Sequence, residues 1–323
     1  MIRPLDAIRR RRPGKVVVLG GLNMDLIADL PRPAGPGETV EGTRFYTTPG
    51  GKGGNQAVAA GRLAGPNVVE MVGRVGRDSY GTEMRDFLTS AGVGTSYLRV
   101  DDAASSGVAI IFIDSTGQNY VNAIYGANSR CDEAQVNDAT LALNGASVLL
   151  AQQEVPLATT HGVMRAARQS GTAVILDPAP ARDVLPDGFL GLADILTPNQ
   201  TEAEALCGIA VKDVDSATRA ATEIRRTGVR GVIIKMGEMG AFASVGPTNR
   251  HFVPFRVPVV ATVAAGDAFN AGLAVGLAAR MPFEQAVWLG MATGAMCVTK
   301  PGAQESMPTL DETEQLLISQ SHR

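Results

Sequence analysis

The sequence predicts an α/β fold with a central, mainly parallel sheet that is covered by helices on both faces. Short, mostly β-branched runs are typical of buried strands, and five of them lie at 15–20, 68–72, 147–151, 173–177 and 231–235. Helical patterns separate these runs, for example at 132–143, 156–169 and 215–227. Because strand and helix alternate, we expect the strands to run parallel between two helical layers.

Two segments interrupt this alternation and predict a small antiparallel sheet that stands off the main body. Residues 25–48 are rich in Pro and Gly, and alternating strands at 106–113 and 118–124 flank a Ser-Thr-Gly turn. We interpret these segments, approximately 25–48 and 106–124, as a lid, because open α/β sheets bind ligands at the carboxyl ends of their strands, where a flap excludes water. From residue 264 onward the chain is expected to be helical, at 266–280, 282–299 and 310–319.

Length and composition predict one large domain at 15–323 behind a basic tail. The 323 residues carry a net charge of −3 and are 45% hydrophobic, which is typical of a soluble protein without a nucleic-acid partner. No apolar run approaches the ~20 residues that span a bilayer, so no membrane partner is expected. The three cysteines and three histidines form no metal-binding or disulfide pattern, which favours the cytoplasm. Residues 1–14 are Arg-rich and precede no apolar segment, which excludes a secretory signal and indicates a disordered tail.

The most informative stretch is Ala264-Ala265-Gly266-Asp267, which comes directly before an apolar helix. The first N–H groups of a helix have no internal partner and carry the positive end of the helix dipole, so they can receive a phosphoryl group. A carboxylate at the same place can accept a proton from an attacking hydroxyl. The alternative is that Asp267 only caps the helix.

Polar residues near the ends of two further strands point to a polyol site. Asn23 and Asp25 follow the first strand two residues apart and therefore face the same side of an extended chain. Together they can bind adjacent hydroxyls, although an ordinary turn would also explain them. Glu154 comes after the strand at 147–151, where it can bind another hydroxyl.

A glycine-rich segment at 49–57 contains four glycines around Lys52, with Asn55 close behind. It lacks the GK[ST] ending of a Walker A loop, and no GxGxxG follows the first strand, which argues against a dinucleotide-binding dehydrogenase. The glycines allow the backbone to approach a ligand closely. Lys52 and Asn55 are then its polar contacts.

Asn199 and Glu202 lie three residues apart at the start of a helix that follows a strand and a proline turn. The pair shares one helical face. An amide and a carboxylate suit hydrated Mg²⁺ and a nucleotide phosphate, because magnesium keeps most of its waters and takes few protein ligands. A capping box explains the same spacing equally well.

The order of these pieces resembles the ribokinase branch of the PfkB family of carbohydrate kinases, from about residue 15 to residue 319. The similar segments are GGLNMD, PGGKGGNQA, GRDSYG, SGVAIIFID, YGAN, QQEVPL, DPAPA, DILTPNQTEAE, VAAGDAFNAG and VTKPGAQESMP. The resemblance implies a ribokinase-like three-layer fold, a β lid that forms a homodimer interface, and ATP-dependent phosphorylation of a sugar hydroxyl.

The resemblance also implies a role for each candidate residue. Asp267 is then the catalytic base, with Ala264, Ala265 and Gly266 forming the anion hole. The sugar-binding residues are Asn23, Asp25, Gly51, Lys52, Gly53, Asn55, Glu154 and Asp267. The nucleotide-binding residues are Asn199, Lys235, Gly237, Gly240, Gly266 and Met291, and Glu202 holds Mg²⁺ through water.

Three positions depart from the family pattern. Ribokinase-like members usually carry an aspartate that helps to hold a monovalent cation beside the anion hole, and this chain has Ala261 instead. Such a site would retain Val263, Cys297, Lys300, Gly302 and Ser306, and we expect only weak K⁺ dependence. Lys235 replaces a small hydroxyl residue, so its ammonium could reach a phosphate, and Met291 replaces a polar residue near the expected adenine.

The sequence therefore predicts an ATP-dependent kinase that phosphorylates the 5-hydroxyl of D-ribose. Another pentose, a ketose or a nucleoside remains an alternative substrate, because a pocket separates isosteric sugars by only a few kcal/mol. A non-catalytic sugar- or nucleotide-binding protein is the alternative from a different class.

Overall fold

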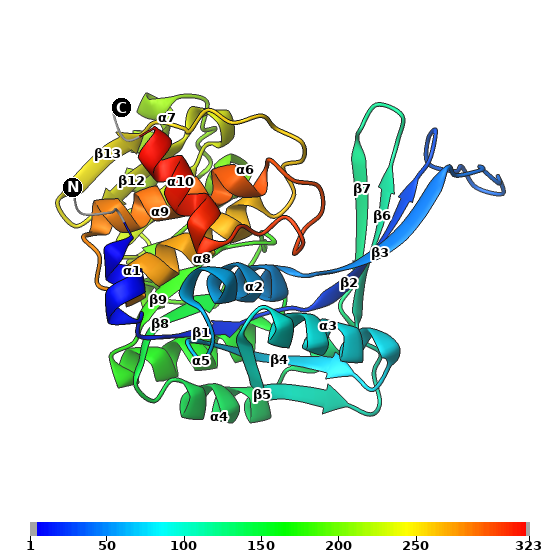
Figure 1. Ribbon diagram of the computed structural model, residues 1–323, viewed down its shortest axis with the longest axis horizontal. Helices are drawn as coiled ribbons and strands as arrows, with labels where there is room; N and C mark the ends of the chain where they lie inside the picture. The colour runs from blue at the N-terminus through cyan, green and yellow to red at the C-terminus, as the bar shows by residue number, and fades with distance from the viewer. Residues whose placement is uncertain (1–4, 321–323) are drawn as a thin grey trace.

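The protein, described here by a computed structural model of residues 5–320, has a layered body from which a small sheet projects (Figure 1). The body contains a nine-stranded sheet in the order β13-β12-β11-β10-β9-β8-β1-β4-β5. All neighbouring strands of this sheet are parallel except β11, β12 and β13, which pair antiparallel at one edge. The α/β architecture with a mainly parallel sheet is thereby confirmed.

The strands of the large sheet begin and end close to the predicted runs. They are β1 (Lys15–Leu19), β4 (Val69–Gly76), β5 (Val93–Asp101), β8 (Ala146–Ala151), β9 (Ala173–Leu176), β10 (Ile195–Leu196), β11 (Gly231–Lys235), β12 (Ala241–Val245) and β13 (Thr248–Phe252). The sequence analysis missed β5, β12 and β13. β5 and β13 are the two edge strands, where the uninterrupted apolar run of a central strand is not required. β12 lies inside the sheet, but its buried residues include two alanines and Ser244, which are less typical of strands than β-branched residues.

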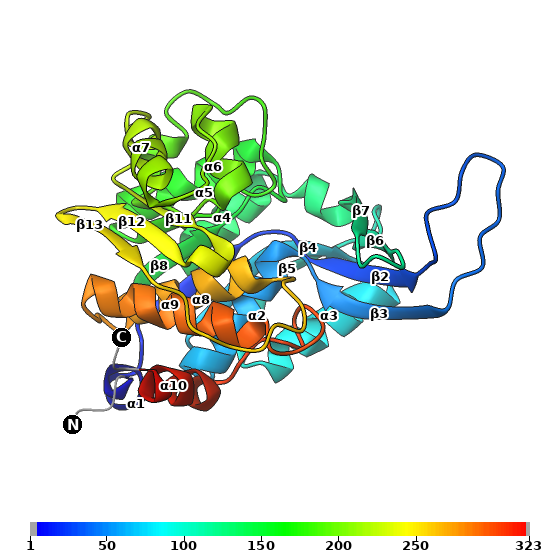
Figure 2. The ribbon, with the colours of Figure 1, turned by 90° about the horizontal axis from the view of Figure 1, so that it is seen from above.

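The α-helices are α1 (Asp6–Arg11), α2 (Lys52–Ala64), α3 (Ser79–Ser90), α4 (Glu133–Ala142), α5 (Leu157–Ser170), α6 (Gln200–Cys207), α7 (Val214–Arg225), α8 (Ala265–Ala278), α9 (Phe283–Cys297) and α10 (Leu310–Ser319). Short 3₁₀ turns are η1 (Gly126–Arg130), η2 (Leu190–Leu192) and η3 (Gly237–Met239). Viewed along the sheet, α2, α3, α8, α9 and α10 lie on one face and α4 to α7 on the other (Figure 2).

The side chains of β1 point alternately to the two faces of the sheet, which explains why helices cover both faces. Val16 and Val18 belong to the core beneath α2 and α8, and Val17 and Leu19 belong to the core on the opposite face. All four side chains are fully buried. Since successive strand residues point to opposite faces, a continuous apolar strand must be covered on both sides.

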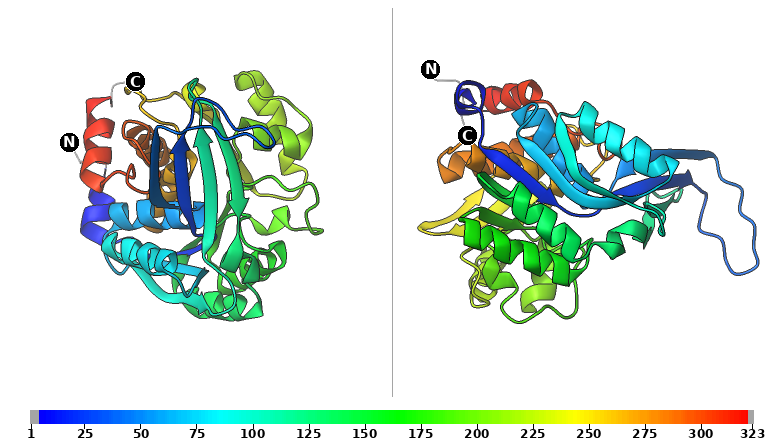
Figure 3. Two further views of the ribbon diagram at one scale, coloured as in Figure 1. Left: turned by 90° about the vertical axis from the view of Figure 1, so that its right-hand side faces the viewer. Right: turned by 90° about the horizontal axis from the view of Figure 1, so that it is seen from below.

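The lid consists of β2 (Asn23–Asp29), β3 (Arg44–Gly50), β6 (Gly107–Ile113) and β7 (Asn119–Ile124), in the order β3-β2-β6-β7. Figure 3 shows these strands side by side, with the connection between β2 and β3 extending beyond them. The expectation of a purely antiparallel sheet was wrong, because β2 and β6 pair in parallel. Both strands leave the body in the same direction, so their pairing cannot be antiparallel.

The N-terminal segment differs from the disordered tail that the sequence indicates. Residues 6–11 form α1, and Leu5 and Ile8 are buried in the main core. Arg9 pairs with Asp311 and, at 2.9 Å, with Glu314 of α10. Two apolar residues three positions apart therefore anchor a segment whose composition is otherwise basic, and residues 1–4 of the expected tail lie outside the described residues.

No helix in the described part of the chain is long and apolar enough to cross a membrane. Within residues 5–320, no group of three or more His, Cys, Asp or Glu side chains is arranged to hold a metal ion.

Candidate active site

Five neighbouring strands end at one edge of the large sheet, and each is followed by polar or glycine residues. In sheet order, β11 ends in Lys235, and β10, β9, β8 and β1 lead into Asn199, Asp177, Glu154 and Gly20-Gly21. The amino ends of α2 and α8 contribute Asn55 and Asp267, which are hydrogen-bonded to each other. The carboxyl edge thus brings together the side chains from which we build the candidate site.

Asp267 lies in the first turn of α8 and is only 5% exposed. Its Oδ2 accepts a hydrogen bond from Asn55 Nδ2 at 2.9 Å, and its Oδ1 accepts one from Gln56 Nε2 at 3.0 Å. The residue at the cap position is Ala264, which has a left-handed φ of 60° and makes no side-chain cap hydrogen bond. Capping therefore does not explain Asp267, whose two oxygens face another helix.

Gln56 is fully buried and links two carboxylates. Its Nε2 donates to Asp267 and also to Asp177 Oδ2 at 3.2 Å, while its Oε1 accepts from Gln152 Nε2 at 2.6 Å. Because Gln152 occupies the carbonyl oxygen, the amide group of Gln56 has one orientation in which all three bonds form. The base candidate is thereby held in place by a network that comes from three elements.

The electrostatics of this cluster suit a proton acceptor. Burial raises the pKa of Asp267, the nearby Lys52 ammonium lowers it, and the net effect is an increase. Burial alone would lower the pKa of Lys52, but the surrounding carboxylates, Asp267 and Asp177 first, outweigh it and raise the pKa. Lys52 therefore stays protonated, while Asp267 is more basic than an ordinary aspartate.

The predicted polyol-binding side chains also lie together. Asn23 and Asp25 begin β2 and are 3% and 8% exposed, and Asn23 Oδ1 accepts from Asn128 Nδ2 at 3.0 Å. Glu154 Oε2 accepts from the Lys52 backbone N–H at 2.7 Å. Burial raises the pKa of Asp25 to about 7, with Glu154 adding to the increase. Burial likewise raises the pKa of Glu154 to about 7, against the lowering effect of Lys52.

The glycines at the start of α2 approach the protein's own backbone, where the sequence analysis expected a ligand. Gly51 has a φ of 79°, and a Cβ there would lie 2.7 Å from the Asn23 backbone nitrogen. A Cβ on Gly53 would lie 2.6 Å from the carbonyl carbon of Gly20. The turn between β1 and β2 therefore rests on the helix start, and side chains larger than hydrogen do not fit between them.

Asn199 and Glu202 form the capping box that the sequence left as an alternative. Asn199 Oδ1 accepts from the Glu202 N–H at 2.8 Å, and Glu202 Oε2 accepts from the Asn199 N–H at 2.7 Å. Burial raises the pKa of Glu202, with Asp177 adding to the increase and Lys235 opposing it. The Glu202 carboxylate thus lies within the electrostatic reach of the cluster, and oxygen donors of this kind suit a hydrated Mg²⁺.

Lys235 ends β11 and pairs with Asp177, with 3.0 Å between Nζ and Oδ1. Its Nζ also lies 3.2 Å from the position that a Cβ on Gly266 would take. After this strand, Gly237 begins η3 and Gly240 follows it, and Met291 on α9 packs against the main core. Among the described residues, no hydrogen bond joins these last three to the Asp267 cluster.

The residues expected around a monovalent cation are close to one another. Cys297 Sγ lies 3.1 Å from Ser306 Oγ and donates to the Val263 carbonyl at 3.6 Å. The Lys300 N–H donates to the Cys297 carbonyl at 3.2 Å, and Gly302 follows in the same loop.

Sequence reasoning missed Gln56, Asp177, Asn128 and Gln152 as members of this cluster. All four do occur in the segments that carry the family resemblance, PGGKGGNQA, YGAN, QQEVPL and DPAPA. Their roles could not be read there, because their partners are far away in the chain.

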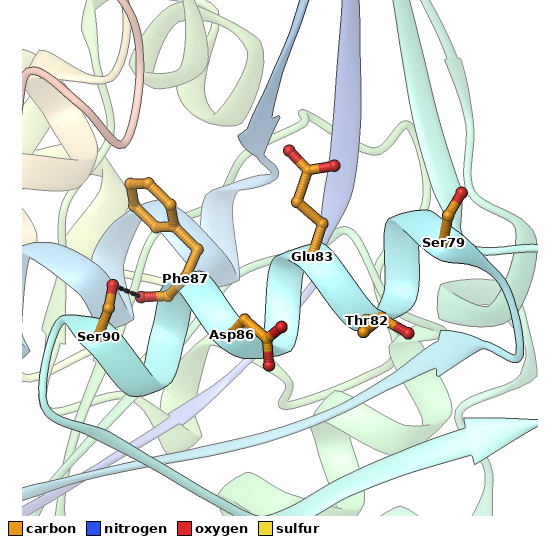
Figure 4. A pocket seen from close by; sticks show the side chains of 6 residues that line it. All are labelled: Ser79, Thr82, Glu83, Asp86, Phe87 and Ser90. Carbon is orange, nitrogen blue, oxygen red and sulfur yellow. Dashed lines mark hydrogen bonds between the residues drawn. The ribbon is translucent and has the colours of Figure 1, made fainter.

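A shallow hollow on α3 lies outside the cluster (Figure 4). Its lining residues are Ser79, Thr82, Glu83, Asp86, Phe87 and Ser90, all on one helix and none a candidate site residue.

A buried carboxylate at the amino end of a helix, next to two lysines and further carboxylates, is an arrangement suited to phosphoryl transfer. Comparison with known proteins agrees with that class. The pfkB family carbohydrate kinase pattern matches residues 13–310. The chain therefore belongs to the pfkB family of carbohydrate kinases.

Individual relatives cover nearly the whole chain. The ribokinase of Haemophilus influenzae is 37% identical over 302 residues, 94% of this chain and 98% of that protein. The deoxyribokinase of Salmonella typhi is 33% identical with the same coverage. The structure of Arabidopsis thaliana ribokinase complexed with ribose and ATP matches with a TM-score of 0.87 at 30% identity, covering 94% of this chain and 99% of that one.

Proposed function

We propose that this protein is an ATP-dependent ribokinase that converts D-ribose and ATP to ribose 5-phosphate and ADP. The observation that carries the proposal is Asp267, a buried carboxylate at the amino end of α8 whose two oxygens are held by Asn55 and Gln56. Ribokinases from several organisms align over nearly the whole chain, and one of them is known with ribose and ATP bound.

In the proposed reaction, Asp267 accepts the proton of the 5-hydroxyl while the hydroxyl oxygen forms a bond to the γ-phosphorus. The bond from that phosphorus to the bridging oxygen breaks, and ADP leaves with the electron pair. The N–H groups at Ala264, Ala265 and Gly266 stabilise the charge on the transferring group. Asp267 and this anion hole act as one unit because both belong to the start of α8.

The proposed sugar site contains Asn23, Asp25, Gly51, Lys52, Gly53, Asn55 and Glu154. In the described structure, Asn55 Oδ1 is buried without a hydrogen-bond partner, although its Nδ2 binds Asp267. An unpaired buried acceptor costs about 1–3 kcal/mol. A sugar hydroxyl donating to this oxygen would remove that cost and would lie next to the base.

The proposed nucleotide site contains Asn199, Lys235, Gly237, Gly240, Gly266 and Met291. Glu202 would hold Mg²⁺ through water, and when bound the ion would neutralise charge on the phosphates. A monovalent cation would be held by the Ser306 hydroxyl and by the carbonyl oxygens of Val263, Cys297, Lys300 and Gly302. Because Ala261 supplies no carboxylate, we expect weak activation by K⁺.

The lid is proposed to form a homodimer interface in a cytoplasmic enzyme. Phe45 on β3 is 66% exposed, and on β7 Tyr120 is 41% exposed and Ile124 46%. The strand register places these three side chains on the same face of the sheet. Apolar side chains gathered on one small sheet favour burial against a second copy. Light scattering of the wild type and of Phe45→Asp tests the interface, since the charge should shift a dimer toward monomer.

Turnover of ATP across a panel of sugars tests the function. We expect ribose to give the highest kcat/KM, with deoxyribose second because a deoxyribokinase is among the relatives. The panel should also contain fructose, another pentose and nucleosides. A higher kcat/KM for one of these would reassign the substrate, whereas tight binding without any turnover would indicate a non-catalytic binding protein.

A further inference from the structure

Lys235 and Asp177 form a charge pair at the carboxyl edge of the sheet. Lys235 is the last residue of β11 and Asp177 follows β9, so the pair reaches across the end of the intervening β10. Its Nζ and Oδ1 are 3.0 Å apart, and the two side chains are only 14% and 2% exposed. A lysine and an aspartate of this kind are costly to bury unless they remain paired.

The ammonium of Lys235 lies beside the first turn of α8. It is 3.2 Å from the position that a Cβ on Gly266 would take, so any larger residue there would press against it. The amino end of a helix carries partial positive charge, and an ammonium next to it adds to the same field. The Lys235 ammonium and the amino end of α8 together favour the binding of an anion between them. Asp177 neutralises the charge of the ammonium but not the partial positive charge of the helix end.

The same pair is connected to the base. Asp177 accepts from Lys235 with Oδ1 and from Gln56 with Oδ2, and Gln56 also donates to Asp267. Lys235, Asp177, Gln56 and Asp267 therefore form one continuous hydrogen-bonded chain. One end of this chain is the Lys235 ammonium beside the first turn of α8, and the other end is the proton acceptor Asp267 within that turn.

We propose that Lys235 is a catalytic residue that contacts the transferring phosphoryl group, and that Asp177 is the positioning residue that holds its ammonium. Within the described residues the ammonium has one acceptor, Asp177, so two of its three N–H bonds remain for phosphate oxygens. The hydroxyl proton goes to Asp267 in the proposed reaction, so Lys235 takes no part in proton transfer. This proposal rests on the phosphotransferase activity proposed above.

The competing explanation is that the pair only stabilises the fold. The two explanations differ in how the protein treats the phosphates of a nucleotide. A phosphate-binding ammonium raises the affinity for ATP relative to AMP, because AMP lacks the β- and γ-phosphates. A purely structural pair has no reason to change that ratio.

The experiment compares the wild type with Lys235→Met, Asp177→Asn and the double variant, with Lys212→Met on an exposed lysine as the matched control. Calorimetry without sugar measures the Kd of ATP and of AMP, and steady-state kinetics follows in the presence of the sugar. For Lys235→Met we expect the ATP-to-AMP affinity ratio and kcat/KM for ATP to fall about 10- to 100-fold, the range for one charge-assisted contact. The Kd of AMP and the KM of the sugar should stay unchanged.

Asp177 is tested by the double variant. If Asp177 acts through Lys235, Asp177→Asn lowers kcat/KM in the wild-type background but not when Lys235 is already replaced by Met. Because the double variant leaves no buried unpaired carboxylate at position 177, it keeps the test valid should Lys235→Met alone fold poorly. Additive losses would overturn the positioning role of Asp177.

The outcomes separate this proposal from the proposed function. An unchanged ATP-to-AMP ratio in the folded Lys235→Met or double variant overturns the phosphate contact, even if the wild type phosphorylates ribose. A wild type that turns over no sugar overturns the proposed function. A reduced ratio in the variants would still support Lys235 as a phosphate-binding residue in that case.

Discussion

Replacing Asp267 by asparagine tests the assignment of the base most directly. The two carboxylate oxygens accept from Gln56 and Asn55, and an amide offers only one acceptor. Whichever way the introduced amide turns, its NH₂ group faces one of the two donors. The Asp267→Asn variant therefore loses both the proton acceptor and one of the hydrogen bonds that orient it.

The expected loss follows from these two effects. A positioned general base contributes about 10²- to 10⁴-fold to the rate, which is about 3–5 kcal/mol of the activation barrier. We expect kcat to fall by that factor while the Kd of ATP changes only a few-fold. Burial raises the pKa of Asp267, so a neutral side chain removes the cost of a buried charge. That gain offsets the lost hydrogen bond, and the melting temperature should stay close to that of the wild type.

The assay measures ADP release with ribose, ATP binding by calorimetry and thermal unfolding for each variant. Asp86→Asn, on the exposed face of α3, is the matched control and should behave as the wild type in all three. If Asp267→Asn retains more than about a tenth of the wild-type kcat, far above the loss expected for a base, Asp267 is not the proton acceptor. A large drop in melting temperature would instead show that its main role is structural.

Four further predictions follow from the site. Burial raises the pKa of Asp25 and Glu154 from ordinary values near 4 to about 7. Between about pH 4 and pH 7 the free folded protein therefore binds more protons than the unfolded chain, and its free energy of unfolding should fall as the pH rises through this range. Since sugar hydroxyls donate to the ionised carboxylates, the KM for sugar should rise as pH falls below 7 at saturating ATP, and a flat profile would contradict this. In urea titrations, Gly51→Ala should lower the free energy of unfolding by about 2–4 kcal/mol, and the control Gly65→Ala should lower it by about 1–2 kcal/mol. Both glycines have a φ of 79°, but only at Gly51 would an added Cβ collide with backbone atoms. Lys235→Met should cost about 2–4 kcal/mol because it leaves Asp177 buried and unpaired, and adding Asp177→Asn should recover most of it. The rate in K⁺ should be within a few-fold of that in tetramethylammonium, and Ala261→Asp should increase the difference; a strong K⁺ requirement in the wild type would refute the reasoning.

The elements that could be predicted are those whose signal is local. The apolar runs of β1, β8, β9 and β11 are buried on both faces, so nearly every residue had to be hydrophobic and the strands were visible. The edge strand β13 lacks that constraint, and its Asn249 and Arg250 are exposed. The N-terminal segment was expected to be disordered but forms α1, because the two buried side chains of Leu5 and Ile8 outweigh its basic composition.

The candidate site divides in the same way. Asp267, Asn55 and Glu154 were predicted because each lies at the end of a strand or the start of a helix, where the local pattern is informative. Gln56 was not, although it neighbours Asn55, because its importance depends on Asp177, 121 residues away, and on Asp267, 211 residues away. Gly51 and Gly53 were correctly marked as unusual, but their backbone contacts depend on how the β1–β2 turn packs.

The sequence by itself determined the alternation of strand and helix, the small lid and the carboxylate at the amino end of α8. These follow from short-range preferences of the backbone and from hydrophobic periodicity. Only the tertiary structure decided that Asp267 faces two carboxamides instead of capping its helix. It also decided that Lys235 meets Asp177 beside Gly266, because the order of parallel strands determines which side chains share an edge, and no short segment of the chain encodes that order.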